Sequence, residues 1–306
     1  MMRFKGLDLN LLQALDVLID VQSVTRAAEQ LHISQPAFSA ALGRLRKHFD
    51  DPLLVQHGKQ MVPTPYAEQL RPRLKSILAD VDAFVSTPAR FDPATSNRVF
   101  RVMASDFILS VALGDLLPAI EVIAPQVSFV IIPTSEHANA MLEAGEVDLL
   151  ITPETYLSDR HPSVALFEER HVVAGWSESP AMQRNLTAGD LETASFITVQ
   201  IGRSHNSSFA ITELDRLGIR LNSTLSISYF AVVPQLLVGS AKLAILHETL
   251  ARKAARHLPI AWQPLPVAIP GMREMVQFHR ARAQDPAVVW LLSQFEAWSR
   301  DRLLEP

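Results

Sequence analysis

The chain has 306 residues, a formal net charge of −4, 48% hydrophobic and 20% charged residues, and no cysteine. Length and composition predict a soluble protein of two or more domains. The lack of cysteine excludes disulfides, thiolate zinc sites and a cysteine nucleophile. We expect a cytoplasmic protein without a membrane partner, because Asp8, Asp16 and Asp20 interrupt any signal-peptide pattern and no apolar run reaches the roughly 20 residues of a membrane span.

The first ninety residues begin with three predicted helices. Leucines and an isoleucine recur at helical spacing between Leu11 and Ile19 and predict the first. Ser23 or Thr25 can cap a short second helix that ends near Leu31. Ser34 can cap a third, with proline in its first turn. Two short helices across such a tight turn are the helix-turn-helix pattern, in which the second helix enters the DNA major groove.

The helix that follows Ser34 has two different faces. One is apolar, formed by Phe38, Ala41, Leu42, Leu45 and Phe49. The other is small and polar at its start and cationic at its end; hydroxyl and amide groups can read base edges, and cations can meet phosphates. The DNA-binding candidates on it are Ser34, Gln35, Pro36, Ser39, Arg44, Arg46 and Lys47. The alternative is an amphipathic helix of a small bundle with a solvated polar face.

A small hairpin is predicted after this helix, because the apolar runs Leu53–Val55 and Met61–Val62 flank a turn at Gly58. Residues 1–63 thus form an all-α winged helix-turn-helix. Residues 1–90 carry 11 Lys and Arg against 9 Asp and Glu. Because this region is only mildly basic, its DNA affinity must come from local phosphate contacts and from the pairing of two DNA-binding domains, and not from a large net positive charge.

These residues resemble the DNA-binding region of LysR-type transcriptional regulators. The matching segments are L-D-L-N-L-L-Q-A-L, S-V-T-R-A-A-E-Q-L-H-I-S-Q-P-A-F-S-A-A-L-G-R-L-R and L-L-V-Q-H-G-K-Q-M-V-P-T-P. The opening R-F-K-G-L-D-L-N-L-L is most similar to the nodulation-regulator branch, whose members include sensors of flavonoids and other aromatics. Many members carry an arginine in the wing, where this chain has Gln56. We therefore expect a weaker wing contact with DNA, or one made by Lys59.

A long helix is predicted over residues 64–90. Thr64 and Pro65 open it, and Tyr66, Leu70, Leu74, Ile77, Leu78 and Val81 follow at helical spacing. One interpretation is a linker that pairs with its copy in a second subunit, which the resemblance favours. The other is a helix packed on its own domain. Pro72 predicts a bend or a late start.

Strands alternate with helices after a Pro-containing boundary at residues 86–97, which predicts α/β architecture with a largely parallel sheet. This arrangement resembles the effector-sensing region of the same family, a two-lobed fold like that of periplasmic solute-binding proteins. Residues 91–306 would be this effector domain. We place lobe I at 91–162 and 266–306 and lobe II at 163–265, with crossings near Pro162–Ser163 and Pro264–Pro266.

Polar and aromatic residues follow several predicted strands, where ligands bind in open α/β sheets. The effector-binding candidates are Ser105, Asp106, Phe107, Thr152, His171, Ser204, His205 and Phe230. Phe107 and Phe230 could sandwich a ring. Each candidate has a structural alternative: the serines as helix caps, the phenylalanines as core, and His171 as an ordinary strand histidine.

Together these patterns favour an aromatic-responsive transcription regulator. Its expected partners are promoter DNA, a small aromatic effector, RNA polymerase and further copies of the chain, as a dimer through the linker helix and as a tetramer. We expect no cofactor, metal site or catalytic residue. One alternative is a solute-binding protein. A hydrolase is the other, since Ser204 and His205 are adjacent, although G-x-S-x-G, P-loop and G-x-G-x-x-G motifs do not occur.

Overall fold

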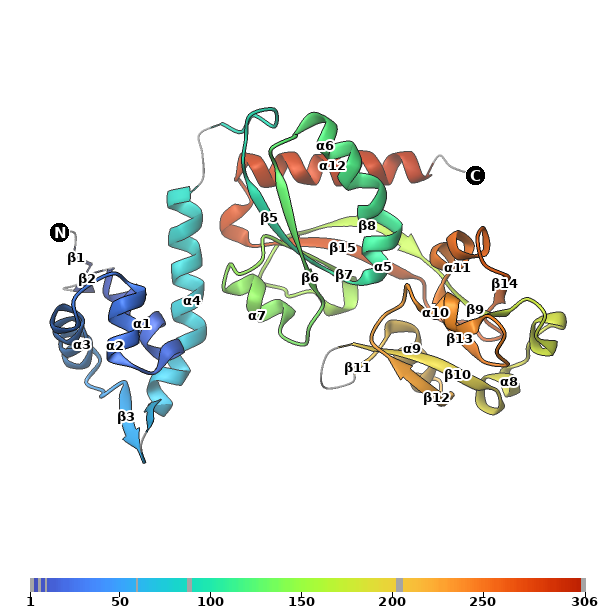
Figure 1. Ribbon diagram of the computed structural model, residues 1–306, viewed down its shortest axis with the longest axis horizontal. Helices are drawn as coiled ribbons and strands as arrows, with labels where there is room; N and C mark the ends of the chain where they lie inside the picture. The colour runs from blue at the N-terminus through green and yellow to red at the C-terminus, as the bar shows by residue number, and fades with distance from the viewer. Residues whose placement is uncertain are drawn as a thin grey trace. The chain divides into compact units, whose positions relative to one another are not determined.

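The computed structural model describes residues 3–4, 7–8, 10–58, 60–86, 90–201 and 206–303, with side chains from residue 8 to residue 300 except at 86, 206 and 207. The chain divides into two compact units (Figure 1). The first comprises residues 1–87 and 143–146, and the second comprises residues 88–142 and 147–306. Within the described ranges, no helix is both long enough and apolar enough to cross a membrane.

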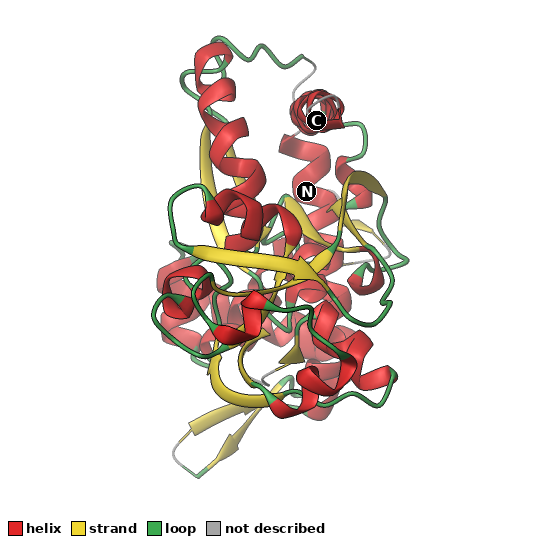
Figure 2. Cartoon of the chain, turned by 90° about the vertical axis from the view of Figure 1, so that its right-hand side faces the viewer, coloured by secondary structure: helices red, strands yellow, loops and turns green. Residues whose placement is uncertain are grey.

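The first unit is the predicted winged helix-turn-helix followed by the long helix. Its elements are β1 (Arg3–Phe4), β2 (Leu7–Asp8), α1 (Asn10–Val21), α2 (Val24–Gln30), α3 (Gln35–Phe49), β3 (Leu54–His57), β4 (Gln60–Pro63) and α4 (Pro65–Ser86). The β3–β4 hairpin projects from the three short helices (Figures 1 and 2). The core lies where α1 and α3 cross, around Leu15, Leu18, Phe38 and Leu45. The short β1–β2 pair was not expected from the sequence.

One carboxylate ties the end of α3, the base of the wing and the start of α4 together. Asp51 Oδ1 accepts hydrogen bonds from the Leu53 N–H at 2.6 Å and from the Thr64 hydroxyl at 2.7 Å. The Thr64 hydroxyl oxygen in turn accepts from the Ala67 N–H at 3.1 Å, which caps α4. Leu53 is fully buried and has a left-handed φ of +63°. That conformation costs energy for a leucine, so these bonds must hold it in place.

Helix α4 begins at Pro65 and continues through Pro72, so the expected late start is wrong. Its first half packs on its own domain, because Ala67 and Leu74 are buried in the core that contains α1. Ile77, Val81, Phe84 and Val85 remain exposed on the second half, with Phe84 at 86%. The packing interpretation therefore holds for the first half of the helix, and pairing of the second half with another copy stays a prediction.

Lobe I of the second unit is a five-stranded sheet in the order β6-β5-β7-β15-β8. Its strands are β5 (Val99–Ala104), β6 (Ser128–Pro133), β7 (Leu149–Pro153), β8 (Ser163–Glu169) and β15 (Met272–Phe278). β5 pairs in parallel with β6 and β7, whereas β15 is antiparallel to β7 and β8. The sheet is therefore mixed, because the chain returns to it through β15.

Helices cover both faces of the lobe I sheet (Figure 1). They are α5 (Asp106–Ile108), η1 (Leu109–Leu113), α6 (Gly114–Ile123), α7 (Ala138–Glu143), η2 (Glu154–Tyr156), η4 (Arg280–Arg282) and α12 (Pro286–Leu303). Alternate residues of β5 serve the two faces, as the two-residue period of a strand requires. Phe100 and Val102 join the main core with α6 and α12, and Met103 joins a small cluster with Leu142 of α7.

The helical segment over residues 106–123 is irregular before Pro118 and not at it. Residues 109–113 form a π-helix, and α6 then runs through Pro118 without interruption. The Gly114 N–H bonds to the Leu109 carbonyl, five residues back. This wider turn frees the Ser110 carbonyl, which accepts a hydrogen bond from Lys253 Nζ at 2.7 Å.

Lobe II is a six-stranded sheet in the order β11-β10-β13-β9-β14, with β12 also paired to β10. Its strands are β9 (His171–Trp176), β10 (Ser195–Ile201), β11 (Asn206–Ser207), β12 (Asn222–Ile227), β13 (Leu243–His247) and β14 (Ile260–Pro264). Its helices are η3 (Pro180–Gln183), α8 (Ala188–Thr193), α9 (Phe209–Arg216), α10 (Val233–Leu237) and α11 (Glu248–Ala255).

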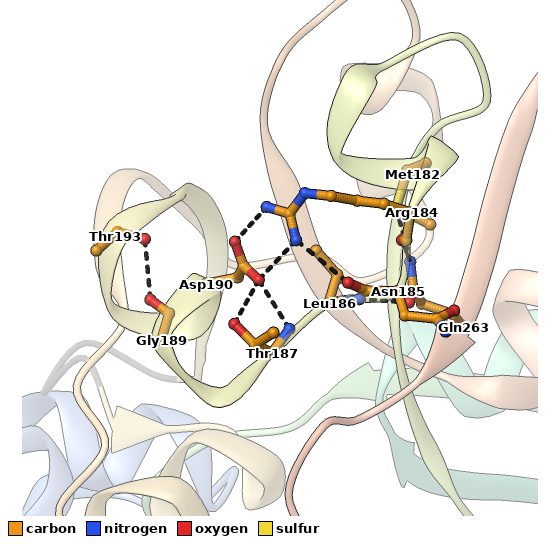
Figure 3. Close-up of polar contacts among 9 residues, drawn as sticks. All are labelled: Met182, Arg184, Asn185, Leu186, Thr187, Gly189, Asp190, Thr193 and Gln263. Carbon is orange, nitrogen blue, oxygen red and sulfur yellow. Dashed lines mark hydrogen bonds and ion pairs between the residues drawn. The ribbon is translucent and has the colours of Figure 1, made fainter.

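Polar contacts fix the segment between η3 and α8 (Figure 3). Asp190 pairs with Arg184 and accepts hydrogen bonds from the Thr187 N–H and hydroxyl, both at 2.7 Å. The Arg184 guanidinium and these Thr187 donors lower the pKa of Asp190. The Gln263 amide joins the segment to β14, because its oxygen accepts from the Leu186 N–H at 3.0 Å and its nitrogen donates to the Arg184 carbonyl at 3.2 Å.

The first crossing between the lobes lies one strand later than expected. β8 (Ser163–Glu169) pairs with β15 in the lobe I sheet, and β9 begins lobe II at His171. A crossing at Pro162–Ser163 is therefore wrong, because the sequence of β8 does not show which sheet it joins. The return crossing lies between β14 and β15, at residues 265–271, beside the expected Pro264–Pro266.

Removing the Asp51 carboxylate should loosen the wing. In Asp51→Ala the Leu53 N–H and the Thr64 hydroxyl lose their acceptor, which costs about 1–3 kcal/mol. Amides of residues 51–64 in the full chain should then exchange hydrogen roughly 5- to 150-fold faster, as mass spectrometry can measure. Asp50→Asn is the matched control, since asparagine tolerates the left-handed conformation at that position. Unchanged exchange in Asp51→Ala would contradict this role.

Candidate functional site

The face of α3 predicted to read DNA is open to solvent. Ser34 caps the helix by accepting a hydrogen bond from the Ala37 N–H at 3.4 Å, and Pro36 occupies the first turn. The apolar face is buried at Phe38, Ala41, Leu42 and Leu45. The candidate residues on the opposite face are exposed: Ser34, Gln35, Pro36, Ser39, Arg44, Arg46 and Lys47. Their roles in DNA contact remain predictions.

Arg46 differs from the other cations on this face because it is bonded to the wing. Its Nε donates to the Pro52 carbonyl at 2.8 Å. Arg44 and Lys47 have no side-chain hydrogen bond or ion pair within the described part of the chain. Arg44 and Lys47 are therefore free to meet phosphates, whereas Arg46 also fixes the wing to the helix.

The wing offers a second surface next to α3. The Gln56 side-chain amide donates to the Gly58 carbonyl at 3.1 Å, within the hairpin's own turn, where Gly58 takes a left-handed φ of +62°. Lys59, the cation expected to replace the arginine of related wings, lies outside the described residues.

The second candidate site is a cavity of about 720 Å³ between the two lobes of the second unit. Four of the predicted effector-binding residues line it: Ser105, Phe107 and Thr152 from lobe I, and Phe230 from lobe II. The cavity also borders a hollow of about 970 Å³ that Asp106 and Tyr229 line. Both volumes lie in the range that holds drug-sized ligands.

Ser105 is a helix cap, since it accepts a hydrogen bond from the Ile108 N–H at 3.3 Å. It also lines the cavity, and its contact with an effector stays a prediction. Asp106 bonds lobe I to lobe II. Its carboxylate accepts from the Phe230 N–H at 3.1 Å and from the Ala231 N–H at 2.7 Å. Ser204 and His205 lie outside the described residues.

The expected ring sandwich between Phe107 and Phe230 is wrong. Their centroids lie 6.5 Å apart in an edge-to-face contact. One face of Phe107 is covered by His247, which stacks on it at 3.6 Å and 9°. His247 also meets the edge of Phe230 at 4.7 Å. These three rings form a continuous wall of the cavity instead of two plates around a ligand.

His171 belongs to the layer behind this wall. It does not line the cavity, and its ring lies 4.9 Å from His247 and 5.7 Å from Phe209. Burial lowers the pKa of His171 to about 4. Burial and the nearby His171 lower the pKa of His247 as well. Both rings are therefore neutral at physiological pH, and neither Nδ1 atom has a hydrogen-bond partner among the described residues.

Glu274, which was not among the predicted residues, lies in the lobe I part of the cavity wall. The side chain is 3% exposed, and its Oε2 atom has no hydrogen-bond partner in the described structure. Burial, together with the neighbouring Glu169, raises the pKa of Glu274 to about 8. A sequence signal existed: in β15, Glu274 shares a face with the buried Met272, Val276 and Phe278.

No group of three His, Asp or Glu side chains placed to hold a metal ion occurs in the described ranges. The cavity wall instead combines rings, hydroxyls such as Thr212, and carboxyls. Such a wall can bind a small organic molecule through stacking and a few hydrogen bonds.

Comparisons with known proteins identify the family of both units. Residues 9–68 match the family model described as the bacterial regulatory helix-turn-helix protein of the lysR family, and residues 94–300 match the LysR substrate binding domain. Nodulation protein D 1 of Mesorhizobium japonicum is 35% identical over 95% of this chain and 92% of its own. Nodulation protein D 3 of Rhizobium leguminosarum bv. phaseoli is 34% identical over 95% and 96%.

Solved structures share the fold. A probable transcriptional regulator from Pseudomonas aeruginosa matches with a TM-score of 0.66 and 26% identity, over 96% of this chain and 97% of its own. Full-length OxyR from Pseudomonas aeruginosa matches with a TM-score of 0.69 and 18% identity, over 96% and 95%. Full-length CbnR, solved with its target DNA, matches with a TM-score of 0.60 and 16% identity, over 96% and 99%. The resemblance to the nodulation-regulator branch is thus confirmed.

The buried Glu274 should make stability fall as pH rises from 6.5 to 8. Folded Glu274 keeps its proton up to a pKa of about 8, whereas the unfolded chain releases it near 4.5. The folded state therefore binds more protons in this window, and deprotonation costs it about 1–2 kcal/mol by pH 8. The two histidines act in the opposite sense and below pH 6.5, since their folded pKa values are lowered.

Thermal unfolding of the full chain between pH 6.5 and 8 checks this. The melting temperature should fall less steeply in Glu274→Gln than in the wild type, because the amide does not titrate. Glu168→Gln should keep the wild-type slope, since Glu168 is 76% exposed. Equal slopes in wild type and Glu274→Gln would show that this carboxyl does not hold its proton.

Proposed function

The chain belongs to the LysR family of bacterial transcriptional regulators, and from this premise we propose that it binds promoter DNA through α3 and responds to a small aromatic effector in the cavity between its two lobes. The observation that carries the proposal is the presence, in one chain, of an exposed cationic helix face and a ring-walled cavity. A solute-binding protein would need only the second of these.

DNA contact would begin at the start of α3. Gln35 and Ser39 have side chains that can bond to base edges in the major groove. Arg44 and Lys47, near the end of the helix, would contact phosphates and fix its orientation. The wing would add a weaker contact, because the Gln56 amide is engaged within its own hairpin and carries no charge.

Self-association would use the exposed apolar side of α4. Ile77, Val81, Phe84 and Val85 lie within three turns of that helix, and a second copy of the helix could cover them. We propose a dimer through this contact and a tetramer through further contacts. The two winged helix-turn-helix domains of a dimer would then bind half-sites about 10 base pairs apart, or a multiple of this distance. Such a regulator would work in the cytoplasm and could contact RNA polymerase at the promoter.

The effector would act by binding one arrangement of the protein more tightly than another, since only a difference in affinity can shift an equilibrium. The cavity suits this role because both lobes build it, and a change in their separation changes its shape. Support for an aromatic effector comes from the walls Phe107, His247 and Phe230, and from the resemblance to regulators that sense flavonoids.

Arg44→Ala should weaken DNA binding without unfolding the protein. The duplex for this test is the one that the wild-type protein selects from a random-sequence pool. Loss of one phosphate contact should lower affinity most at low salt, and should reduce the slope of log K against log salt by about 1. Arg46→Ala should weaken binding too, with faster hydrogen exchange in the wing as a second effect.

Arg256→Ala serves as the control, since it removes an exposed cation that follows α11 in the second unit. Fluorescence anisotropy measures the three variants side by side. If Arg44→Ala bound this duplex with the wild-type affinity and salt slope, the proposed face of α3 would be wrong.

An aromatic effector should raise the melting temperature of the full chain by mass action, by an amount that grows with its concentration. The screen compares flavonoids, salicylates and chlorinated phenols. Thr152→Trp, which places a bulky ring in the cavity wall, should abolish the shift. A shift that persists in this variant would place the ligand elsewhere on the protein.

A further inference from the structure

Glu274 has an unusual environment for a carboxyl group. It is 3% exposed, it lines the cavity, and its Oε2 atom lacks a hydrogen-bond partner among the described residues. A buried polar group without a partner costs about 1–3 kcal/mol. The Oε2 atom itself is covered by neighbouring atoms, so a ligand in the cavity would become its partner after a rotation of the Glu274 side chain.

The charges near Glu274 do not neutralise it. The described residues that line the cavity include Glu136 and Asp215 but no lysine or arginine. Arg273, the next residue in β15, pairs instead with Glu168 at 3.2 Å and with Glu154 at 3.7 Å; all three side chains are about half exposed or more. The neighbouring Glu169 carboxylate accepts from the Thr249 N–H and the Arg170 N–H, both at 3.2 Å.

We propose that Glu274 is a specificity-determining residue, which bonds to a hydroxyl group of an uncharged aromatic effector and excludes aromatic carboxylates. The proposal rests on the effector cavity proposed above and names the class of ligand that the cavity selects. Phe107, His247 and Phe230 would hold the rings, and Glu274 would recognise the polar group.

The protonation of Glu274 suits a neutral ligand. With a pKa of about 8, the carboxyl keeps its proton at neutral pH, so it can donate a hydrogen bond to a ligand oxygen and accept one from a phenol O–H. A ligand carboxylate would instead place a negative charge near the Glu169 carboxylate in a site of low polarity. That charge would have to lose its water without gaining a cation among the described lining residues.

Three matched probes test this at pH 7: flavone, its 4′-hydroxy derivative and its 4′-carboxylate. They share one ring system and differ in a single group. Quenching of tryptophan fluorescence in the full chain measures their affinities. The hydroxylated probe should bind about tenfold more tightly than flavone, since a hydrogen bond to a buried, otherwise unpaired group gains about 1.4 kcal/mol. The carboxylate should bind at least about tenfold more weakly than flavone.

Two variants assign these preferences to Glu274. Glu274→Met keeps the volume and removes the polar group, so flavone binding should persist and the hydroxyl preference should disappear. Glu274→Gln keeps a neutral hydrogen-bonding group, so the hydroxyl preference should remain. In the wild type, affinity for the carboxylate probe should fall as pH rises from 6.5 to 8.5, because Glu274 loses its proton. In Glu274→Gln this fall should be absent. Glu168→Gln, a surface carboxyl of the adjacent strand, should behave as wild type.

The outcomes separate this proposal from the effector cavity itself. One outcome is that the wild type binds flavone, Thr152→Trp does not bind it, and Glu274→Met still prefers the hydroxylated probe. In that case the effector cavity stands and the role of Glu274 is overturned. Equal binding of the carboxylate and the phenol by the wild type would overturn it as well. If none of the probes binds, or if Thr152→Trp leaves binding unchanged, the effector cavity has failed, and the specificity assigned to Glu274 falls with it.

Discussion

The contact on which the second unit depends is made by residues 105–107, directly after β5. The Phe107 ring stacks on His247 at 3.6 Å, and the Asp106 carboxylate accepts two backbone N–H groups of lobe II. One short turn thus supplies an apolar and a charged contact between the lobes, and Ser105 caps it. The main core runs through both lobes across this point. A cavity that borders this contact is well placed to couple a ligand to the separation of the lobes.

The buried titratable groups of the cavity wall and of the layer behind it, Glu274, His247 and His171, share one property, which is that they carry no charge at neutral pH. Burial lowers the pKa of His171 and His247 and raises that of Glu274. Burying a neutral polar group costs less desolvation free energy than burying an ion, so these groups destabilise the folded protein only moderately when the cavity is empty. The same neutrality favours uncharged ligands. Stability and ligand preference therefore have one physical origin, and a change at Glu274 affects both.

Local patterns predicted the first unit well, because caps, helical spacing and the turn at Gly58 each involve residues close in sequence. Ser34 and the buried face of α3 are examples. Patterns failed where pairing is distant: the sequence of β8 does not reveal that β15 is its partner. Phe107 and Phe230 were found, but not the His247 ring that covers one of them. Glu274 was not predicted because it lies inside β15, whereas the general rule for open α/β sheets places ligands at strand ends.

The central claim is that an aromatic ligand occupies the cavity between the lobes. Thr152 lines that cavity and is half-buried, and the chain has no cysteine of its own. The rate at which a maleimide alkylates Thr152→Cys in the full chain, with and without hydroxylated flavone, therefore measures occupancy directly. A ligand in the cavity should lower this rate as its concentration rises, and should leave the rate unchanged for Glu121→Cys on the exposed side of α6. An unchanged rate at Thr152→Cys under saturating ligand would show that the ligand does not occupy the cavity.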